Sequence, residues 1–188
     1  LINDILDIAS IEAGYMQLDI RSFDIHAMIH SMPSLVGERA RNVGITLKLE
    51  CDAQIGMMDG DENRIRQILF NLLTNSIKYT ETNGTITLGV KTGETPDQLV
   101  FWVEDTGMGI TPEEQDYVFS KFYRTAGASR KNSGTGLGLS MVKSFVELHG
   151  GRVELSSQIG VGTTIYCHFP RKNFAASSAQ LPKVVSHA

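Results

Sequence analysis

Residues 62–79, ENRIRQILFNLLTNSIKY, form the helix around which we expect the rest of the chain to be arranged. Apolar residues recur in this segment at the i, i+3, i+4, i+7, i+8 spacing of an amphipathic α-helix: Ile65, Ile68, Leu69, Leu72 and Leu73. One face of this helix is therefore expected to be buried in a core.

A second set of side chains on the same helix is polar. Asn71, Asn75 and Lys78 project within a narrow arc away from the apolar stripe, because a helix turns about 100° per residue. Amide oxygens are hard ligands that suit Mg²⁺, which usually keeps several waters and shares substrate phosphates. Tyr79, the next residue, can stack on a base. Taken alone, the segment is more simply interpreted as a core helix with a solvated polar face.

Composition limits the class of protein. The chain has 188 residues, of which 41% are hydrophobic and 20% are charged, which is typical of one soluble globular domain with appendages. A net charge of −4 argues against a nucleic-acid surface. Cys51 and Cys167 lack metal-ligand spacing, so structural roles in a reducing cytoplasm are expected. With no apolar run long enough to span a bilayer and no signal peptide, any membrane contact is expected through missing upstream segments.

The first residues are predicted to form a helix, and apolar residues recur at helical spacing from Leu1 onward. We expect residues 1–14 to be the end of a longer helix that packs against another helix in a bundle or dimer. The alternative is that this helix folds back on its own domain. Residues 15–23 are expected to be a linker, residues 24–171 the main domain, and residues 172–188 a disordered tail.

The main domain alternates helices and strands. Asp24 is expected to be the N-cap of a helix that runs to about Asn42. Pro33 should end or kink this helix locally, unless it begins a new turn. Thr111 and Pro112 resemble the start of another helix, and residues of about 111–133 form an expected lid. Strands are expected at residues 45–50, 57–58, 85–91, 98–104, 152–157 and 163–169. A further helix is expected at residues 138–149, so that His149 stands at its end.

Two glycine-rich segments carry candidate chemistry. In DTGMG, residues 105–109, the aspartate ends a strand and can accept a hydrogen bond from an exocyclic amine, while the glycines let the backbone approach a flat ring. An Asx turn is the commoner meaning of this pattern. In GTGLGLS, residues 134–140, the glycines precede a helix, whose N-terminus favours anions. The surroundings fit neither a Rossmann motif nor a P-loop.

VFSKFYR, residues 118–124, lies between these two segments. One interpretation is a helix end with two core phenylalanines, Phe119 and Phe122. The other is a lid hinged on those aromatic residues, with Arg124 able to reach a phosphate.

The order of these motifs resembles the N, G1, F and G2 boxes of bacterial sensor histidine kinases. The resemblance covers roughly residues 24–170, and the helix ending in SIEAG, residues 10–14, is similar to the last part of that family's dimerisation hairpin. It implies the ATP-binding catalytic domain of such a kinase, with the GHKL or Bergerat fold. That fold is an α/β, two-layer sandwich with a mixed, mostly antiparallel sheet backed by three helices.

The resemblance also implies roles for individual residues. Asn75 would coordinate Mg²⁺, Asn71 would support the metal and phosphate region, and Lys78 would contact phosphate. Tyr79 would flank the adenine of ATP and Asp105 would bind its amine. The remaining implied nucleotide contacts are Gly107, Gly109, Arg124, Gly134, Thr135, Gly136, Leu137, Gly138 and Thr163.

Two details refine the implied activity. Hydrolytic relatives carry a glutamate where Asn71 stands, and an amide cannot act as that base, so phosphoryl transfer is favoured over hydrolysis. The family's acceptor histidine sits in a His-Glu or His-Asp context, which is absent around the histidines of this chain: His26, His30, His149, His168 and His187. The implied partners are therefore an acceptor hairpin of the same protein, in a homodimer, and a response regulator receiver domain. The alternatives are a degenerate kinase domain that acts as a conformational module and a gyrase-like or chaperone-like ATPase.

Overall fold

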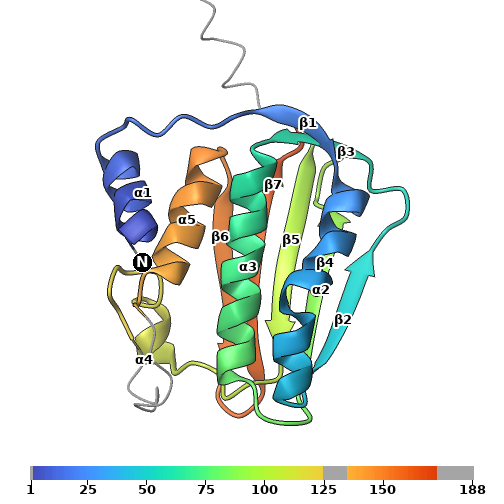
Figure 1. Ribbon diagram of the computed structural model, residues 1–188, viewed down its shortest axis with the longest axis vertical. Coiled ribbons are helices and arrows are strands. Elements are labelled where there is room, and N and C mark those ends of the chain that lie inside the picture. The colour runs from blue at the N-terminus through green and yellow to red at the C-terminus, as the bar shows by residue number, and fades with distance from the viewer. Residues whose placement is uncertain (1, 125–134, 173–188) are drawn as a thin grey trace, which may run out of the picture.

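The computed structural model describes residues 2–124 and 135–172. Its main sheet has strand order β2-β4-β5-β7-β6 (Figure 1). β2 pairs parallel with β4, and every other neighbouring pair is antiparallel. The sheet is therefore mixed and mostly antiparallel, as expected. Its strands are β2 (Thr46–Cys51), β4 (Thr85–Thr92), β5 (Gln98–Asp105), β6 (Arg152–Gln158) and β7 (Gly162–Pro170).

Three helices cover one face of this sheet (Figure 1). They are α2 (Ile25–Asn42), α3 (Glu62–Tyr79) and α5 (Gly138–Leu148). α3 lies in the middle and contacts both of the others. The short α4 (Pro112–Gln115) lies at the edge of the molecule. The expected two-layer α/β sandwich with three helices on its sheet is confirmed.

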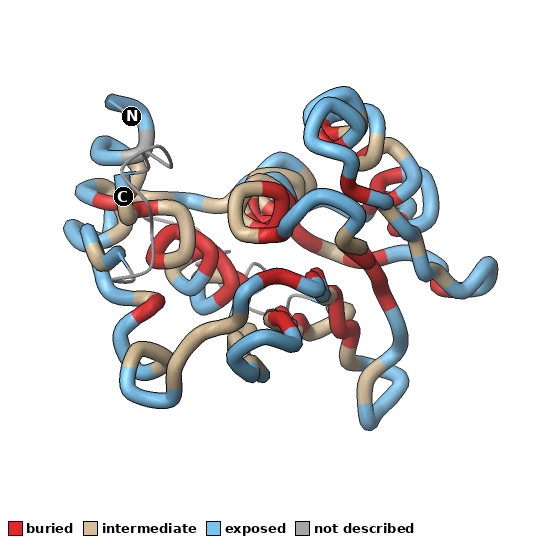
Figure 2. Tube along the Cα trace, turned by 90° about the horizontal axis from the view of Figure 1, so that it is seen from below, coloured by how far each residue is buried: buried red, intermediate tan, exposed pale blue. Residues whose placement is uncertain are grey.

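The core lies between these two layers, where buried residues of the helices and of the sheet face each other (Figure 2). The five apolar residues of the α3 stripe are all at most 2% exposed, so the predicted buried face is confirmed. On the sheet side, the rings of Phe101 and Phe169 pack edge to face with centroids 5.7 Å apart. Cys167 of β7, which pairs with Phe101 of β5, is a buried free thiol, and burial raises its pKa to about 12.

Three of the helices begin at a side chain that caps them, and two of these caps, Asp24 and Thr111, were expected from the sequence. The Asp24 carboxylate accepts a hydrogen bond from the Ala27 N–H at the start of α2. Asp61 caps α3 and Thr111 caps α4 in the same way. α2 runs through Pro33 as one helix, so the expectation that Pro33 could end it is wrong. Burial of apolar residues on both sides of the proline holds the two halves against the core.

A second, two-stranded sheet was not predicted in full. β1 (Arg21–Asp24) pairs antiparallel with β3 (Met57–Gly60) at one end of the molecule. The strand near Met57 was expected, but residues 21–23 were assigned to a linker. A four-residue strand with one buried side chain, Phe23, is too short for its alternation to be recognised.

The N-terminal helix α1 (Ile2–Glu12) folds back against α5, which is the second of the two alternatives for this segment. Ile8 is only 8% exposed there. Asp7 forms a bidentate ion pair with Arg64 of α3, with N–O distances of 2.8 and 3.2 Å. Ile2, Ile5 and Leu6 of the same helix remain exposed.

Candidate functional site

A cavity of about 1420 Å³ opens beside α3 and is closed below by the edge of the sheet where β5 ends. Most of the residues singled out in the sequence line it. They are Asn71, Asn75, Lys78, Tyr79, Asp105, Gly109, Arg124, Thr135, Gly136, Gly138 and Thr163. Segments that are far apart in the sequence therefore converge on one space.

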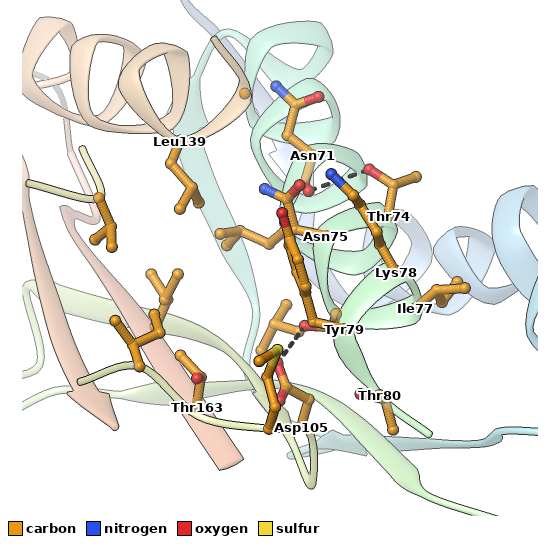
Figure 3. A pocket seen from close by; sticks show the side chains of 18 of the residues that line it. Asn71, Thr74, Asn75, Ile77, Lys78, Tyr79, Thr80, Asp105, Leu139 and Thr163 are labelled. Carbon is orange, nitrogen blue, oxygen red and sulfur yellow. Dashed lines mark hydrogen bonds between the residues drawn. The ribbon is translucent and has the colours of Figure 1, made fainter. Parts of the chain in front are cut away.

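The polar face of α3 forms one wall (Figure 3). Asn71, Asn75 and Lys78 follow one another along this wall, as the helical spacing predicted. The Lys78 ammonium lies 4.7 Å from the centre of the Tyr79 ring, a cation–π distance. Two amides, a cation and an aromatic face are thus presented from a single helix.

Asp105 lies on the floor of the cavity at the end of β5. One of its carboxylate oxygens accepts a hydrogen bond from the Ser76 hydroxyl at 2.9 Å, and the other accepts one from the Gly107 N–H at 3.0 Å. Burial raises the pKa of Asp105 above its usual value, although the hydrogen bonds from Ser76 and Gly107 and the backbone of Thr163 act to lower it. The carboxylate is fixed in position and keeps unused lone pairs for a donor in the cavity.

The glycines after Asp105 are required by close backbone packing. Gly109 has φ +72°, and a Cβ there would lie 2.1 Å from the Gln158 carbonyl oxygen. A Cβ on Gly107 would lie 2.6 Å from the Tyr79 carbonyl oxygen. Gly107 is therefore packed behind the cavity wall and does not line the cavity itself. These contacts fix the loop against α3 and β6.

The second glycine segment approaches the same cavity from α5. Gly136 has φ +71°, and its carbonyl accepts a hydrogen bond from the Phe122 N–H at 2.9 Å. A Cβ on Gly138 would meet the Asn75 amide nitrogen at 3.6 Å, so the start of α5 faces the α3 amides directly. Leu137 is buried in the core and lines no part of the cavity. Gly134 lies outside the described residues, as do residues 125–133 of the expected lid.

The segment between the two glycine motifs is not the end of a helix. Beyond α4 it forms turns, and Phe122 has φ 62° and is 67% exposed. The interpretation with two core phenylalanines is therefore wrong for Phe122, while Phe119 is partly buried against the core. Arg124, two residues after Phe122, lines the cavity.

Two contributors to the site were missed in the sequence. Ser76, which holds Asp105, lies within the buried stripe of α3, and a small hydroxyl there was a usable signal. Arg39 on α2 also lines the cavity, but it belongs to no motif, and only the packing of α2 beside α3 brings it there.

Comparison with known proteins identifies the family. The family described as "Histidine kinase-, DNA gyrase B-, and HSP90-like ATPase" matches residues 60–173 of this chain, which is more than half of it. The chain belongs to this ATPase family. The matched range contains every residue singled out for the site in the sequence.

Relatives of this ATPase domain include named histidine kinases. The chain is 37% identical to circadian input-output histidine kinase CikA of Synechococcus elongatus, over 98% of this chain and 24% of that protein. It is 33% identical to histidine protein kinase DivJ of Caulobacter vibrioides, over 90% of this chain and 28% of that protein. The chain thus spans about a quarter of the length of these relatives.

Solved structures with the same fold include the catalytic domain of a named histidine kinase. Full-length ShkA in complex with AMPPNP superposes with a TM-score of 0.79 at 30% identity, covering 89% of this chain and 34% of ShkA. The catalytic domain of histidine kinase ThkA gives a TM-score of 0.72 at 26% identity, covering 82% of this chain and 97% of that domain. No described helix of the ATPase domain has the length and hydrophobicity needed to cross a bilayer.

Proposed function

We propose that this chain is the ATP-binding catalytic domain of a sensor histidine kinase. It would transfer the γ-phosphate of ATP to a histidine on a separate dimerisation hairpin, for relay to a response regulator. The observation that carries the proposal is the convergence of Asn71, Asn75 and Lys78 with Asp105 and the Gly136–Gly138 segment on one cavity. The named histidine kinases among the relatives support the same activity.

The floor of the cavity suits adenine. Asp105 would accept a hydrogen bond from the exocyclic amine, because Ser76 and Gly107 leave each oxygen a further lone pair. Tyr79 would flank the base, and Gly107 and Gly109 hold the loop that lines it. The Thr163 hydroxyl, 2.8 Å from that of Ser157, would join through a water.

The donor groups above the floor fit a metal–triphosphate. Asn75 and Asn71 would supply amide oxygens to Mg²⁺ and its waters, which suits a hard cation. When bound, Mg²⁺ would offset the negative charge of the phosphates. Lys78 and Arg124 would stabilise charge on the phosphate chain from the α3 side and from the segment after α4. Backbone N–H groups of Thr135, Gly136 and Gly138 at the start of α5 would face the phosphates, and Gly134 and Leu137 belong to the same proposed segment.

Asn71 favours transfer over hydrolysis. A hydrolytic ATPase of this fold needs a base that takes a proton from water, and an amide has no basic lone pair for that step. In the proposed transfer, the attacking group is the imidazole of the acceptor histidine. Any base that takes its proton would lie beside that histidine, on another part of the protein. We therefore place gyrase-like hydrolysis second.

The proposed organisation follows from this activity. Residues 1–14 would be the end of the second hairpin helix, 15–23 a linker, 24–171 the catalytic domain with a lid at about 111–133, and 172–188 a tail. Residues 125–134 and 173–188 of these segments lie outside the described residues. The partners would be the acceptor hairpin of a homodimer and a receiver domain, at a cytoplasmic location with any membrane anchor upstream. Nucleic acid is not a proposed partner.

Calorimetric titration with a non-hydrolysable ATP analogue and Mg²⁺ tests the nucleotide site. The parent should bind saturably, and Asn75→Ala and Asp105→Asn should bind at least tenfold more weakly. Asn75→Ala removes an amide oxygen proposed for Mg²⁺ and its waters, and Asp105→Asn removes the charged acceptor proposed for the adenine amine. Asn63→Ala is the matched control, since Asn63 is an exposed residue of the same helix outside the cavity. A parent that binds no nucleotide would overturn the proposal and favour a conformational module.

A second assay separates transfer from hydrolysis. The parent should release almost no phosphate from ATP on its own. A longer chain that includes the upstream acceptor segment should become labelled by γ-³²P-ATP, and the Asn75→Ala form of that chain should not. Steady phosphate release by the parent alone would instead support the hydrolytic alternative.

A further inference from the structure

Arg39 is a cationic wall residue that lies outside the family match. Among the described residues, the other basic ones that line the cavity are Lys78 and Arg124. Both fall within residues 60–173, whereas Arg39 comes from α2. Val43, about one helical turn after Arg39, lines the cavity as well. The last turn of α2 therefore forms a wall that no sequence motif indicated.

The register between two helices fixes this wall. The Arg66 guanidinium of α3 donates a hydrogen bond to the Ser31 hydroxyl of α2, which aligns these positions. Roughly two turns further along each helix are Arg39 and Thr74. One turn beyond them are Val43 and Lys78, and all four residues line the cavity. Arg39 is thus held on the α2 side of Lys78, away from the start of α5.

Arg39 is also available to a ligand. Its side chain is exposed, and within residues 2–124 and 135–172 no hydrogen bond or ion pair engages it. Its near neighbour Arg41 differs, since a nitrogen of that guanidinium lies 3.5 Å from the Cβ position of Gly37 and Arg41 lines no part of the cavity. A guanidinium presents five donors in a planar fork that matches phosphate oxygens.

We propose that Arg39 binds the phosphate chain of the nucleotide from the α2 side, opposite the contacts made from the start of α5. This inference rests on the proposed function, because it needs ATP in the cavity. Among the acidic residues that line the cavity, Asp105 is on the floor and bonded to Ser76 and Gly107, and Glu81 follows α3. A cation on α2 therefore adds attraction for a polyanion where α3 supplies Lys78 alone.

The test compares adenosine, ADP and AMPPNP binding, with Mg²⁺, by the parent and three variants. Arg39→Ala should raise the Kd of ADP and AMPPNP about fivefold to tenfold, the range for one exposed charge-assisted contact to phosphate. It should leave the Kd of adenosine within twofold, since adenosine has no phosphate. Arg39→Lys should recover part of the loss, because it keeps the charge without the fork. Arg41→Ala removes the same charge two residues away and should leave all three Kd values within twofold.

Each outcome has a distinct meaning. Equal weakening of AMPPNP by Arg39→Ala and Arg41→Ala would show a general field effect and overturn the contact. Equal weakening of adenosine and AMPPNP by Arg39→Ala would show a structural role instead, and so would a fall in its melting temperature. Unchanged binding by Arg39→Ala in a parent that binds AMPPNP overturns this inference alone. A parent that binds none of the three ligands overturns the proposed function with it.

Discussion

At the scale of one residue, Asp105 is expected to have opposite effects on nucleotide binding and on the stability of the fold. Burial raises the pKa of this carboxyl in the folded chain. The stability linked to that shift is fully present below the unfolded pKa of about 3.9 and is lost as the pH rises through the folded pKa. At neutral pH, the folded chain therefore holds a buried carboxylate at a cost.

Asp105→Asn should consequently bind ATP analogue at least tenfold more weakly without losing stability. The amide can still accept from Gly107 and donate to Ser76, but its second N–H would face the adenine amine, which is also a donor. Melting curves at pH 7 should place the variant at or above the parent. A variant that melts well below the parent, and whose weaker binding is explained by its smaller folded fraction, would contradict this view of Asp105.

Some residues of the site are placed by the spacing within one helix, and others by the packing of segments far apart in the chain. Asn71, Asn75 and Lys78 could be placed together from the sequence, because helical spacing alone puts them on one face. The sequence could not predict that Phe122 is exposed or that Arg39 lines the cavity. Both depend on how segments far apart in the chain pack, and neither leaves a periodic pattern.

The turn between β6 and β7 offers a matched pair of glycines at the scale of one element. Gly162 has φ +142°, and a Cβ there would lie 1.8 Å from the Asp105 carbonyl oxygen. Gly160 has φ +73° with nothing within 4 Å of its Cβ position. Gly160→Ala should cost about 1 kcal/mol of unfolding free energy, from backbone strain alone. Gly162→Ala should cost at least about 3 kcal/mol, because the backbone under Asp105 must move.

Denaturant unfolding of these two variants measures both costs. Nucleotide binding supplies the second readout, since the turn packs against the site. Gly162→Ala should also weaken the ATP analogue, while Gly160→Ala should leave its Kd within twofold. Equal effects of the two substitutions would mean that the close approach to Asp105 does not matter.

His149 connects two helices that both border the site. It ends α5, where its Nδ1–H donates to the Phe145 carbonyl at 2.7 Å, and its Nε2 accepts from the Asp61 N–H at the start of α3 at 3.1 Å. Accepting that hydrogen bond requires a neutral ring. Burial lowers the pKa of His149 in the folded chain. Its structural position at a helix end was predicted from the sequence, but its partner in α3 was not.

The sign of the pH effect follows from this lowered pKa. The stability that neutral His149 contributes is fully present above the unfolded pKa of about 6.5 and is lost as the pH falls through the folded pKa. Parent and His149→Gln should differ most in unfolding free energy near pH 7.5. The difference should shrink on acidification by up to about 1.4 kcal/mol per pH unit within that window. A difference that is constant from pH 7.5 to pH 5 would exclude this role.

At the scale of the whole molecule, the two layers were expected before the structure was known, and the position of the N-terminal helix α1 was not. Long amphipathic helices and alternating strands report burial on one face directly, so most elements could be predicted from their own residues. Their arrangement as a two-layer sandwich was implied by the resemblance to histidine kinases. The position of α1 did not follow, because a broad apolar face fits a partner helix and its own domain equally well. In the structure Ile8 packs towards the core, and Ile5 of the same helix stays 47% exposed.

Ile8→Ala and Ile5→Ala therefore test whether α1 is part of the folded unit. Ile8→Ala should lower the free energy of unfolding by about 2 kcal/mol, the low end for a buried isoleucine, because it lies at the margin of the core. Ile5→Ala should change it by less than about 0.5 kcal/mol. Urea unfolding at two chain concentrations tenfold apart measures both values. If α1 packs on its own domain, the loss from Ile8→Ala is the same at both concentrations; a loss seen only at the higher concentration would place Ile8 in contact with a second copy instead.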